Sequence, residues 1–303
     1  MVSTLQSAKS VMQVYKVTSD GVVSNKAVKR ADFLNEFRNI PPALIGMEAC
    51  GGSQHWAREL QSLGHTVRLM PPKLVKPYVT GLKNDKNDAR GIYTALVMGM
   101  REVPVKSAAI QDLALLQTMR TKRQREKVAK INHIRGILTE YGLITGKSVN
   151  AFLAKAGSLI VELKERADVS PFMVSELNAL FPKVKEAMAK IKELETNIES
   201  IAKTLKHYDL FQSAPGVGPI TAATMLVLHC NPEVFKNGRE FAAYIGLAPK
   251  SSGSGGKNFV THIPKKYECN NEVRTLLVQC AHAICRSKHL SLIHISEPTR
   301  RRG

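Results

Sequence analysis

The chain has 303 residues, 44% of them hydrophobic and 6% aromatic, which is enough for one or two cores built mainly from aliphatic side chains. Its 44 Lys and Arg residues against 25 Asp and Glu residues give a formal net charge of +19. This excess favours a nucleic-acid partner, because cationic side chains displace the counterions of a phosphate backbone, while a basic protein without such a partner is the alternative.

Targeting and redox signals are weak in this sequence. No apolar run approaches the roughly 20 residues of a membrane span, and the N-terminal residues lack the apolar core of a signal peptide. The five cysteines are odd in number and follow no framework spacing. We therefore predict a cytoplasmic protein without a membrane partner.

Residues 1 to about 105 predict an α/β sheet. Residues 10–29 alternate around Asp20-Gly21, which is typical of a β-hairpin. The segments that follow predict, in order, a helix at 30–39, a buried strand at 45–50, an amphipathic helix at 53–64, a strand at 65–72 and a helix at 84–100. Such a succession of strands and helices is an α/β layout.

Residues 110 to about 208 change character and predict a helical hairpin or coiled-coil spacer. Two long stretches, 110–142 and 181–207, carry apolar residues at intervals of three to four among many charges. The first stretch and the residues just before it are strongly basic, through Lys106, Arg120, Lys122, Arg123, Arg125, Lys127, Lys130 and Arg135. A solvated helix face and a stripe that grips a phosphate backbone are both open interpretations.

Three carboxylates occur at predicted element ends. Glu48 ends the apolar strand, and Asp85 and Asp88 share a face at the start of a helix because they are three residues apart. Carboxylates that converge above a sheet are typical of two-metal phosphodiester chemistry. The alternative is structural: Asp85 caps the helix, and Asp88 pairs with Arg90 or Lys86.

A glycine-rich turn precedes an apolar helix near residue 219. Gly216 and Gly218 belong to the run APGVGPITAATMLV, which resembles a helix-hairpin-helix grip on a DNA backbone. A plain turn before a helix is the alternative.

The segment 241–266 follows, with a Ser/Gly run flanked by Lys250 and Lys257. We interpret it as a flexible loop that holds a phosphate and presents a serine hydroxyl, against the alternative of a Ser/Gly linker.

Together these stretches resemble the transposases of insertion-sequence family 110. The most specific are GMEACGGSQHWARELQSLGHTVRLMPPKLVKPYV, KNDKNDARGI, SAPGVGPITAATML and FAAYIGLAPK. The resemblance implies an RNase H-like (RuvC-like) domain with an Asp-Glu-Asp-Asp metal site for Mg²⁺ or Mn²⁺, a coiled-coil spacer, and a mostly α C-terminal domain with a nucleophilic serine. It also implies a bacterial or archaeal, nucleoid-associated homo-oligomer (dimer or tetramer), with element-end and target DNA and a structured guide RNA as partners.

Carried over residue by residue, the resemblance makes Glu48, Asp85 and Asp88 the second, third and fourth acids. The first acid position, before Ala8-Lys9, is occupied by Gln6, whose neutral amide oxygen removes charge from the site. The serine run also departs from the family pattern, and alignment from either side makes Ser254 the predicted nucleophile and Ser252 the second candidate.

The predicted domains are a RuvC-like metal-dependent domain at 1–107, a helical spacer at 108–207 and a C-terminal transposase domain at 208–288. Residues 289–303 read as a translated sequencing adapter and are expected to be an artefactual tail. The expected activity is excision and insertion of an insertion sequence through metal-assisted cleavage and a serine–DNA link. A RuvC-like structure-selective nuclease and a defective nucleic-acid-binding remnant are the alternatives.

Overall fold

A computed structural model describes residues 2–7, 10–18, 20–21, 23–82, 84–228, 235–249, 251–254, 257–260 and 271–286. The chain divides into two compact units, Met1–Gln111 and Asp112–Gly303, which we describe separately. The three predicted domain ranges remain predictions.

The first unit contains a five-stranded mixed sheet in the order β3-β2-β1-β4-β5. Its strands are β1 (Val2–Ser7), β2 (Val11–Val17), β3 (Val23–Lys29), β4 (Leu44–Glu48) and β5 (Thr66–Met70). β2 runs antiparallel to β1 and β3, while β4 runs parallel to β1 and β5. The predicted hairpin and the strands at 45–50 and 65–72 are confirmed, and β1 is added before them.

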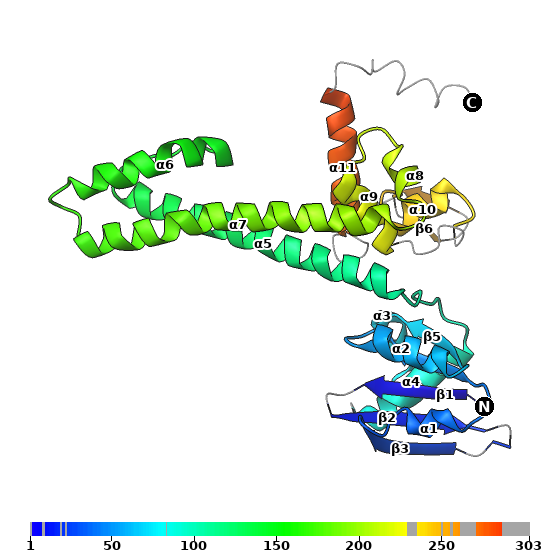
Figure 1. Cartoon of the computed structure of the whole chain (residues 1–303). Helices are drawn as coiled ribbons and strands as arrows, with labels where there is room; N and C mark the ends of the chain where they lie inside the picture. The colour runs from blue at the N-terminus through cyan, green and yellow to red at the C-terminus, as the bar shows by residue number, and fades with distance from the viewer. Residues whose placement is uncertain are drawn as a thin grey trace, which may run out of the picture. The chain divides into compact units, whose positions relative to one another are not determined.

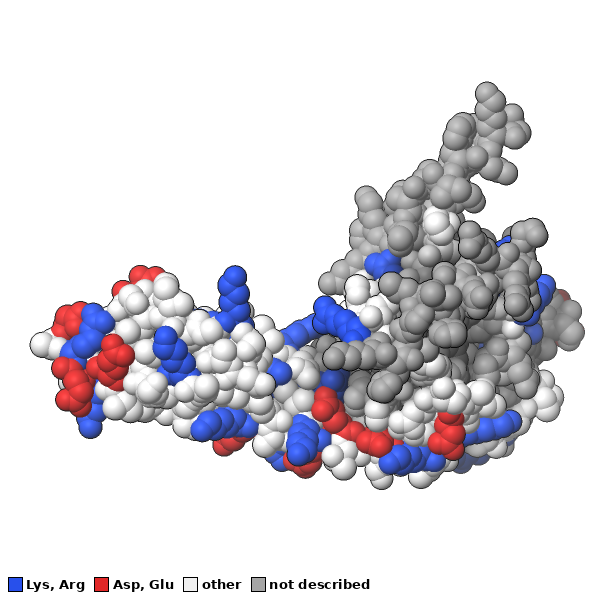
Figure 2. Space-filling model, turned by 90° about the horizontal axis from the view of Figure 1, so that it is seen from above, with Lys and Arg blue, Asp and Glu red and all other residues white. Residues whose placement is uncertain are grey.

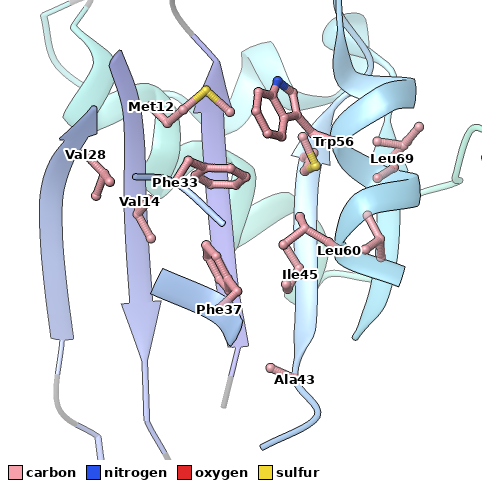
Figure 3. Close-up of a cluster of buried hydrophobic side chains, with 13 residues drawn as sticks. Met12, Val14, Val28, Phe33, Phe37, Ala43, Ile45, Trp56, Leu60 and Leu69 are labelled. Carbon is pink, nitrogen blue, oxygen red and sulfur yellow. The ribbon is translucent and has the colours of Figure 1, made fainter. Parts of the chain in front are cut away.

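One face of the sheet is covered by α1 (Asn35–Arg38) and α2 (Ser53–Ser62). Phe33, Phe37 and Trp56 pack there on Met12 and Ile45, and all five side chains are buried (Figure 3). The two predicted helices on this face form because their apolar positions recur at helical spacing and find this cluster.

The opposite face is covered by α4 (Asp85–Val97), which follows the short helices α3 (Pro72–Val75) and η1 (Lys76–Tyr78). Buried Ile92 and Leu96 of α4 pack with Met70, and the half-buried Val2 and Leu44 border the same cluster. Strand alternation accounts for the division, because Ile45 belongs to the first cluster and Leu44 to this one.

Gly91 sets the distance between α4 and η1. A Cβ atom at this position would lie 2.6 Å from Val79 Cγ2 and 3.1 Å from Val79 Cα. We expect Gly91→Ala to lower the free energy of unfolding by about 1–2 kcal/mol, because overpacking against backbone outweighs the gain in helix propensity. Gly136→Ala in α5, where nothing lies within 4 Å of the added atom, is the matched control and should not destabilise. Chemical denaturation measures both, and equal stabilities of the two variants would contradict the expectation.

The second unit is mainly helical. It contains most of α5 (Ala108–Glu140), then α6 (Val149–Lys164), α7 (Pro171–Lys203), α8 (Tyr208–Gln212), α9 (Pro219–Leu228), α10 (Gly238–Tyr244) and α11 (Asn271–Arg286). A two-stranded antiparallel sheet of β6 (Ser251–Ser254) and β7 (Lys257–Val260) lies between α10 and α11 in sequence.

The two 33-residue helices α5 and α7 run antiparallel. Leu113 near the start of α5 shares a core with Ile198 near the end of α7, whereas Leu138 at the other end of α5 shares one with Leu177. Long helices are therefore confirmed, and a coiled coil remains a prediction. The two long helices form an antiparallel pair, and α6, which lies between them in sequence, packs on both through Phe152.

The start of α7 differs from the predicted stretch at 181–207, because the helix already begins at Pro171. Pro171 is at the beginning of α7, where the missing N–H is not needed, and Ser170 caps the helix by accepting from the Phe172 N–H. Pro182 lies inside the helix. Burial of Leu177 and Val184 on either side offsets the lost hydrogen bond, a cost of about 3 kcal/mol.

Candidate functional site: a carboxylate edge of the sheet

The ends of β1 and β4 meet at one edge of the first unit's sheet. The parallel register pairs Leu5 with Met47, so position 6 and Glu48 follow at the carboxyl ends of adjacent strands. Glu48 is half-buried and occupies the same strand face as Leu44 and Gly46, the face that α4 covers. Position 6 is two residues beyond Thr4, whose hydroxyl also contacts α4. Gln6 and Glu48 therefore occupy neighbouring positions at the edge predicted for the acids.

The first half of α4 is attached to this face of the sheet by two hydrogen bonds. Thr4 Oγ1 donates to the Ala89 carbonyl oxygen at 2.7 Å, and Asn25 Nδ2 of β3 donates to the Lys86 carbonyl oxygen at 3.1 Å. Leu96, at the other end of α4, lies against Gly46 instead. Asn25, Thr4 and Gly46 lie in one row across the sheet, so α4 crosses from β3 over β1 toward β4, with Asp85 and Asp88 on its first turn.

The structural interpretation of Asp85 and Asp88 is not supported in the described part of the chain. The helix cap is Asn84, whose side chain accepts from the Asn87 N–H at 2.8 Å, so Asp85 is not the cap. Arg90 donates to Thr80 Oγ1 at 2.8 Å, and among the described residues neither aspartate has an ion pair within 4.0 Å. Both acids thus remain available for another partner.

The pKa of the neighbouring Cys50 thiol depends on its burial and on the charge of Glu48. Burial raises the pKa of the Cys50 thiol, and the negative charge of Glu48 raises it further. Cys50 therefore remains protonated at neutral pH and is a poor nucleophile.

Glu48, Asp85 and Asp88 have the ligand atoms that a divalent cation needs, but the structure does not show all three close together. Carboxylate oxygens are the ligands that Mg²⁺ and Mn²⁺ prefer, and Glu48 is on the face of the sheet that the acid-bearing helix α4 covers. Among the described residues, however, no group of three or more His, Cys, Asp or Glu side chains lies close enough to hold an ion. A metal site made by Glu48, Asp85 and Asp88 therefore remains a prediction.

The glycine turn before α9 has a packing role. Gly216 has a φ of +76°, and a Cβ atom there would lie 2.8 Å from the Cys280 carbonyl oxygen and 2.7 Å from Ile284 Cγ1 of α11. Gly218 has open space around it, and Pro219 opens α9 as predicted. Only glycine lets this turn approach α11 so closely, and a helix-hairpin-helix grip on DNA remains a prediction.

The predicted flexible serine loop is wrong in the described residues, which form a hairpin instead. Ser251–Ser254 pairs with Lys257–Val260, with Ser254 opposite Lys257 and Ser252 opposite Phe259. Positions 252 and 254 alternate with the exposed Gly253, so the two candidate nucleophiles occupy one face of the strand. Lys250 lies outside the described residues.

The basic stripe of α5 is partly used by the fold. Arg120 forms an ion pair with Glu195 of α7 at 2.6 Å, and Arg135 donates to the carbonyl oxygens of Gly146, Lys147 and Ser148. Lys122 and Arg123 are exposed, and Arg123 pairs with Glu126 within the helix. Figure 2 shows basic side chains interspersed with acidic ones toward the end of the unit that α6 occupies.

Two comparisons with known proteins decide the family. The chain matches the IS110 DEDD transposase model over residues 6–143 and the transposase IS116/IS110/IS902 family model over residues 208–294. It is 37% identical over 287 residues to a protein named as a probable family 20 transposase of Pseudomonas aeruginosa, covering 93% of this chain and 83% of the relative. The chain belongs to the IS110 family of transposases.

A second IS110-type relative gives the same result. The transposase for insertion sequence element IS1111A of Coxiella burnetii is 33% identical over 281 residues, which cover 92% of this chain and 76% of that protein. The first family model includes Gln6, Glu48, Asp85 and Asp88, and the second includes the serine hairpin. A DNA-cleaving, recombinase type of activity with divalent metal dependence and DNA as partner is general to such a transposase family.

Two residues that position the site were missed from the sequence. Thr4 attaches β1 to α4, and Asn84 caps the acid-bearing turn. Asn84 had a readable signal, since asparagine before an acidic first turn is a common helix start. Thr4 had no such signal, because its partner is 85 residues away.

No described helix is long and apolar enough to cross a membrane.

Proposed function

We propose that this chain is a DNA transposase that excises and inserts an insertion sequence, with an RNase H-like (RuvC-like) first unit and a serine nucleophile in the second. The observation that carries the proposal is that Glu48 lies on the sheet face covered by the acid-bearing helix α4, in a chain of the IS110 family. The mixed sheet with helices on both faces supports the RNase H-like interpretation.

Glu48, Asp85 and Asp88 would hold Mg²⁺ or Mn²⁺ at this edge. When bound, the cation supplies Lewis-acid stabilisation of charge on the phosphate oxygens. The three carboxylates would hold that cation, and the hydrogen bonds from Thr4 and Asn25 fix the acid-bearing helix α4 on the sheet.

Ser254 is the proposed nucleophile. Its oxygen attacks phosphorus, an O–P bond forms, the P–O bond to the leaving deoxyribose oxygen breaks, and the serine proton passes to solvent or to a carboxylate. The product is a phosphoserine link that keeps the energy of the phosphodiester for rejoining. Lys257, opposite Ser254 in the hairpin, and the preceding Lys250 supply positive charge for the DNA backbone.

The remaining basic positions supply sequence-independent affinity. Lys122 and Arg123 on α5 are proposed to contact phosphates of DNA or of a structured guide RNA, in a dimer or tetramer. Arg120 is a weaker candidate, because its guanidinium already pairs with Glu195. The glycines at 216 and 218 are proposed to bring the α9 turn near a backbone phosphate.

The second candidate function is a catalytically defective nucleic-acid-binding remnant, which position 6 favours. A glutamine there lacks the charge that the family pattern supplies. The deciding experiment incubates the complete, RNA-loaded protein with Mg²⁺ and element-junction DNA and looks for a covalent protein–DNA band. The band is expected of a transposase. DNA binding with neither a covalent band nor cleavage would favour the remnant. DNA cleavage without a covalent band would favour a structure-selective nuclease.

A further inference from the structure

The loop that follows Glu48 has the features of an anion site. Cys50-Gly51-Gly52 connects β4 to α2, and Gly52 is the N-cap of this ten-residue helix, with a φ of +85°. The Ser53 N–H is bonded to the Cys50 carbonyl oxygen, and because glycine has no side chain to cap the helix, the N–H groups that follow have no side-chain acceptor. Gly51 and Gly52 are exposed, so a ligand has access to these groups.

A buried donor also points toward this turn. Trp56 is 7% exposed, and its indole Nε1 is buried without a hydrogen-bond partner in the described structure. The same nitrogen lies 4.0 Å from the point where a Cβ atom of Gly52 would be. Figure 3 shows it directed toward the end of the sheet at which β4 terminates. A buried N–H without an acceptor is destabilising, and an incoming phosphate oxygen would supply the missing acceptor.

A cation completes the group. Arg30 follows β3 at the same edge, where its backbone N–H is bonded to the Ser10 carbonyl oxygen. Its Nη2 atom lies 3.8 Å from the Gly52 Cβ point, and its guanidinium carbon is 5.1 Å from the centroid of the Trp56 ring. The side chain is exposed, and a guanidinium group can donate two parallel hydrogen bonds to one phosphate.

We propose that the Gly51-Gly52 turn, the first turn of α2, Trp56 Nε1 and Arg30 bind a backbone phosphate of the DNA strand next to Glu48. Helix N-termini with glycine turns bind phosphate through backbone N–H groups, and these groups carry no base preference. The site positions DNA and takes no part in bond cleavage. It rests on the proposed function for its choice of DNA over another polyanion.

The test is equilibrium binding of the full chain to labelled DNA duplex of arbitrary sequence in EDTA, where no cleavage occurs. Trp56 is the only tryptophan, so its emission reports directly on the site. We expect saturating DNA to change that emission. We expect Arg30→Gln to weaken DNA binding roughly tenfold. The slope of log K against log salt concentration should fall by about one, as for the loss of one phosphate contact. Trp56→Phe keeps the ring, removes the donor and should weaken binding by roughly threefold to tenfold in an anisotropy assay.

Arg38→Gln is the matched control, because Arg38 is an exposed arginine of the same unit at the end of α1. Equal losses for Arg30→Gln and Arg38→Gln would overturn the site. So would an unchanged emission at saturating DNA, or a change produced by duplex RNA and not by DNA. This assay involves no metal or serine chemistry. If the variants bind DNA like the wild-type chain and the wild-type chain still forms the covalent protein–DNA band, only the phosphate site is rejected. If the wild-type chain binds no DNA at all, the proposed function is rejected as well.

Discussion

Replacing Ser254 by alanine is expected to reduce the covalent protein–DNA product more than about a hundredfold, because no other atom at that position can form the phosphoester. The measurement is a denaturing gel of the RNA-loaded protein with labelled element-junction DNA. Ser254→Cys should retain part of the product, since a thiol is also a nucleophile.

Ser252→Ala is the control for this result. It removes a hydroxyl from the same face of β6, two positions away, and keeps the pairing with β7. We expect it to leave most of the covalent product intact. If Ser252→Ala abolishes the product and Ser254→Ala does not, the assignment of Ser254 is wrong. Loss in both variants with unchanged DNA binding would also contradict a single nucleophile.

Replacing Gln6 by aspartate is expected to tighten binding of Mn²⁺ by about tenfold to a hundredfold and to raise metal-dependent cleavage. Position 6 adjoins Glu48 at the carboxyl edge, so an added carboxylate contributes charge where the cation would bind. Two unit charges 4 Å apart interact by about 4 kcal/mol at an effective dielectric constant of 20, and solvent at the edge lowers that figure. Titration calorimetry with Mn²⁺ measures the affinity.

Ser7→Asp is the matched variant for Gln6→Asp. It adds the same charge one residue later in β1, on the opposite face of the strand. An equal rise in Mn²⁺ affinity for the two variants would indicate a general effect of charge and contradict the role of position 6. An unchanged affinity in Gln6→Asp would do so too.

The sheet could be predicted because its strands carry their own signals. The alternation of 10–29 and the apolar run at 45–50 specify half-buried strands, and the carboxylate at position 48 falls on a fixed face once that strand is placed. Family motifs then identify the acids without geometry. Whether their side chains meet around one ion depends on how α4 is attached, which the sequence does not express.

Errors arose where distant contacts override local composition. The run Ser-Ser-Gly-Ser has no β-branched residue, and it forms a strand because Lys257–Val260 pairs with it. Pro182 is a helix breaker by local rules, yet α7 continues through it because buried side chains flank it. Arg120 and Arg135 also have partners within the fold, Glu195 and the 146–148 carbonyl oxygens, and a DNA contact at Arg120 remains a prediction.

The most direct measurement of the central claim is Mn²⁺ binding to the full chain and to Glu48→Gln, followed by electron paramagnetic resonance. If Glu48 and the α4 acids share a cation, the wild-type chain binds Mn²⁺, and Glu48→Gln weakens that binding by about tenfold or more, with the fold unchanged. Wild-type affinity in Glu48→Gln would contradict the account.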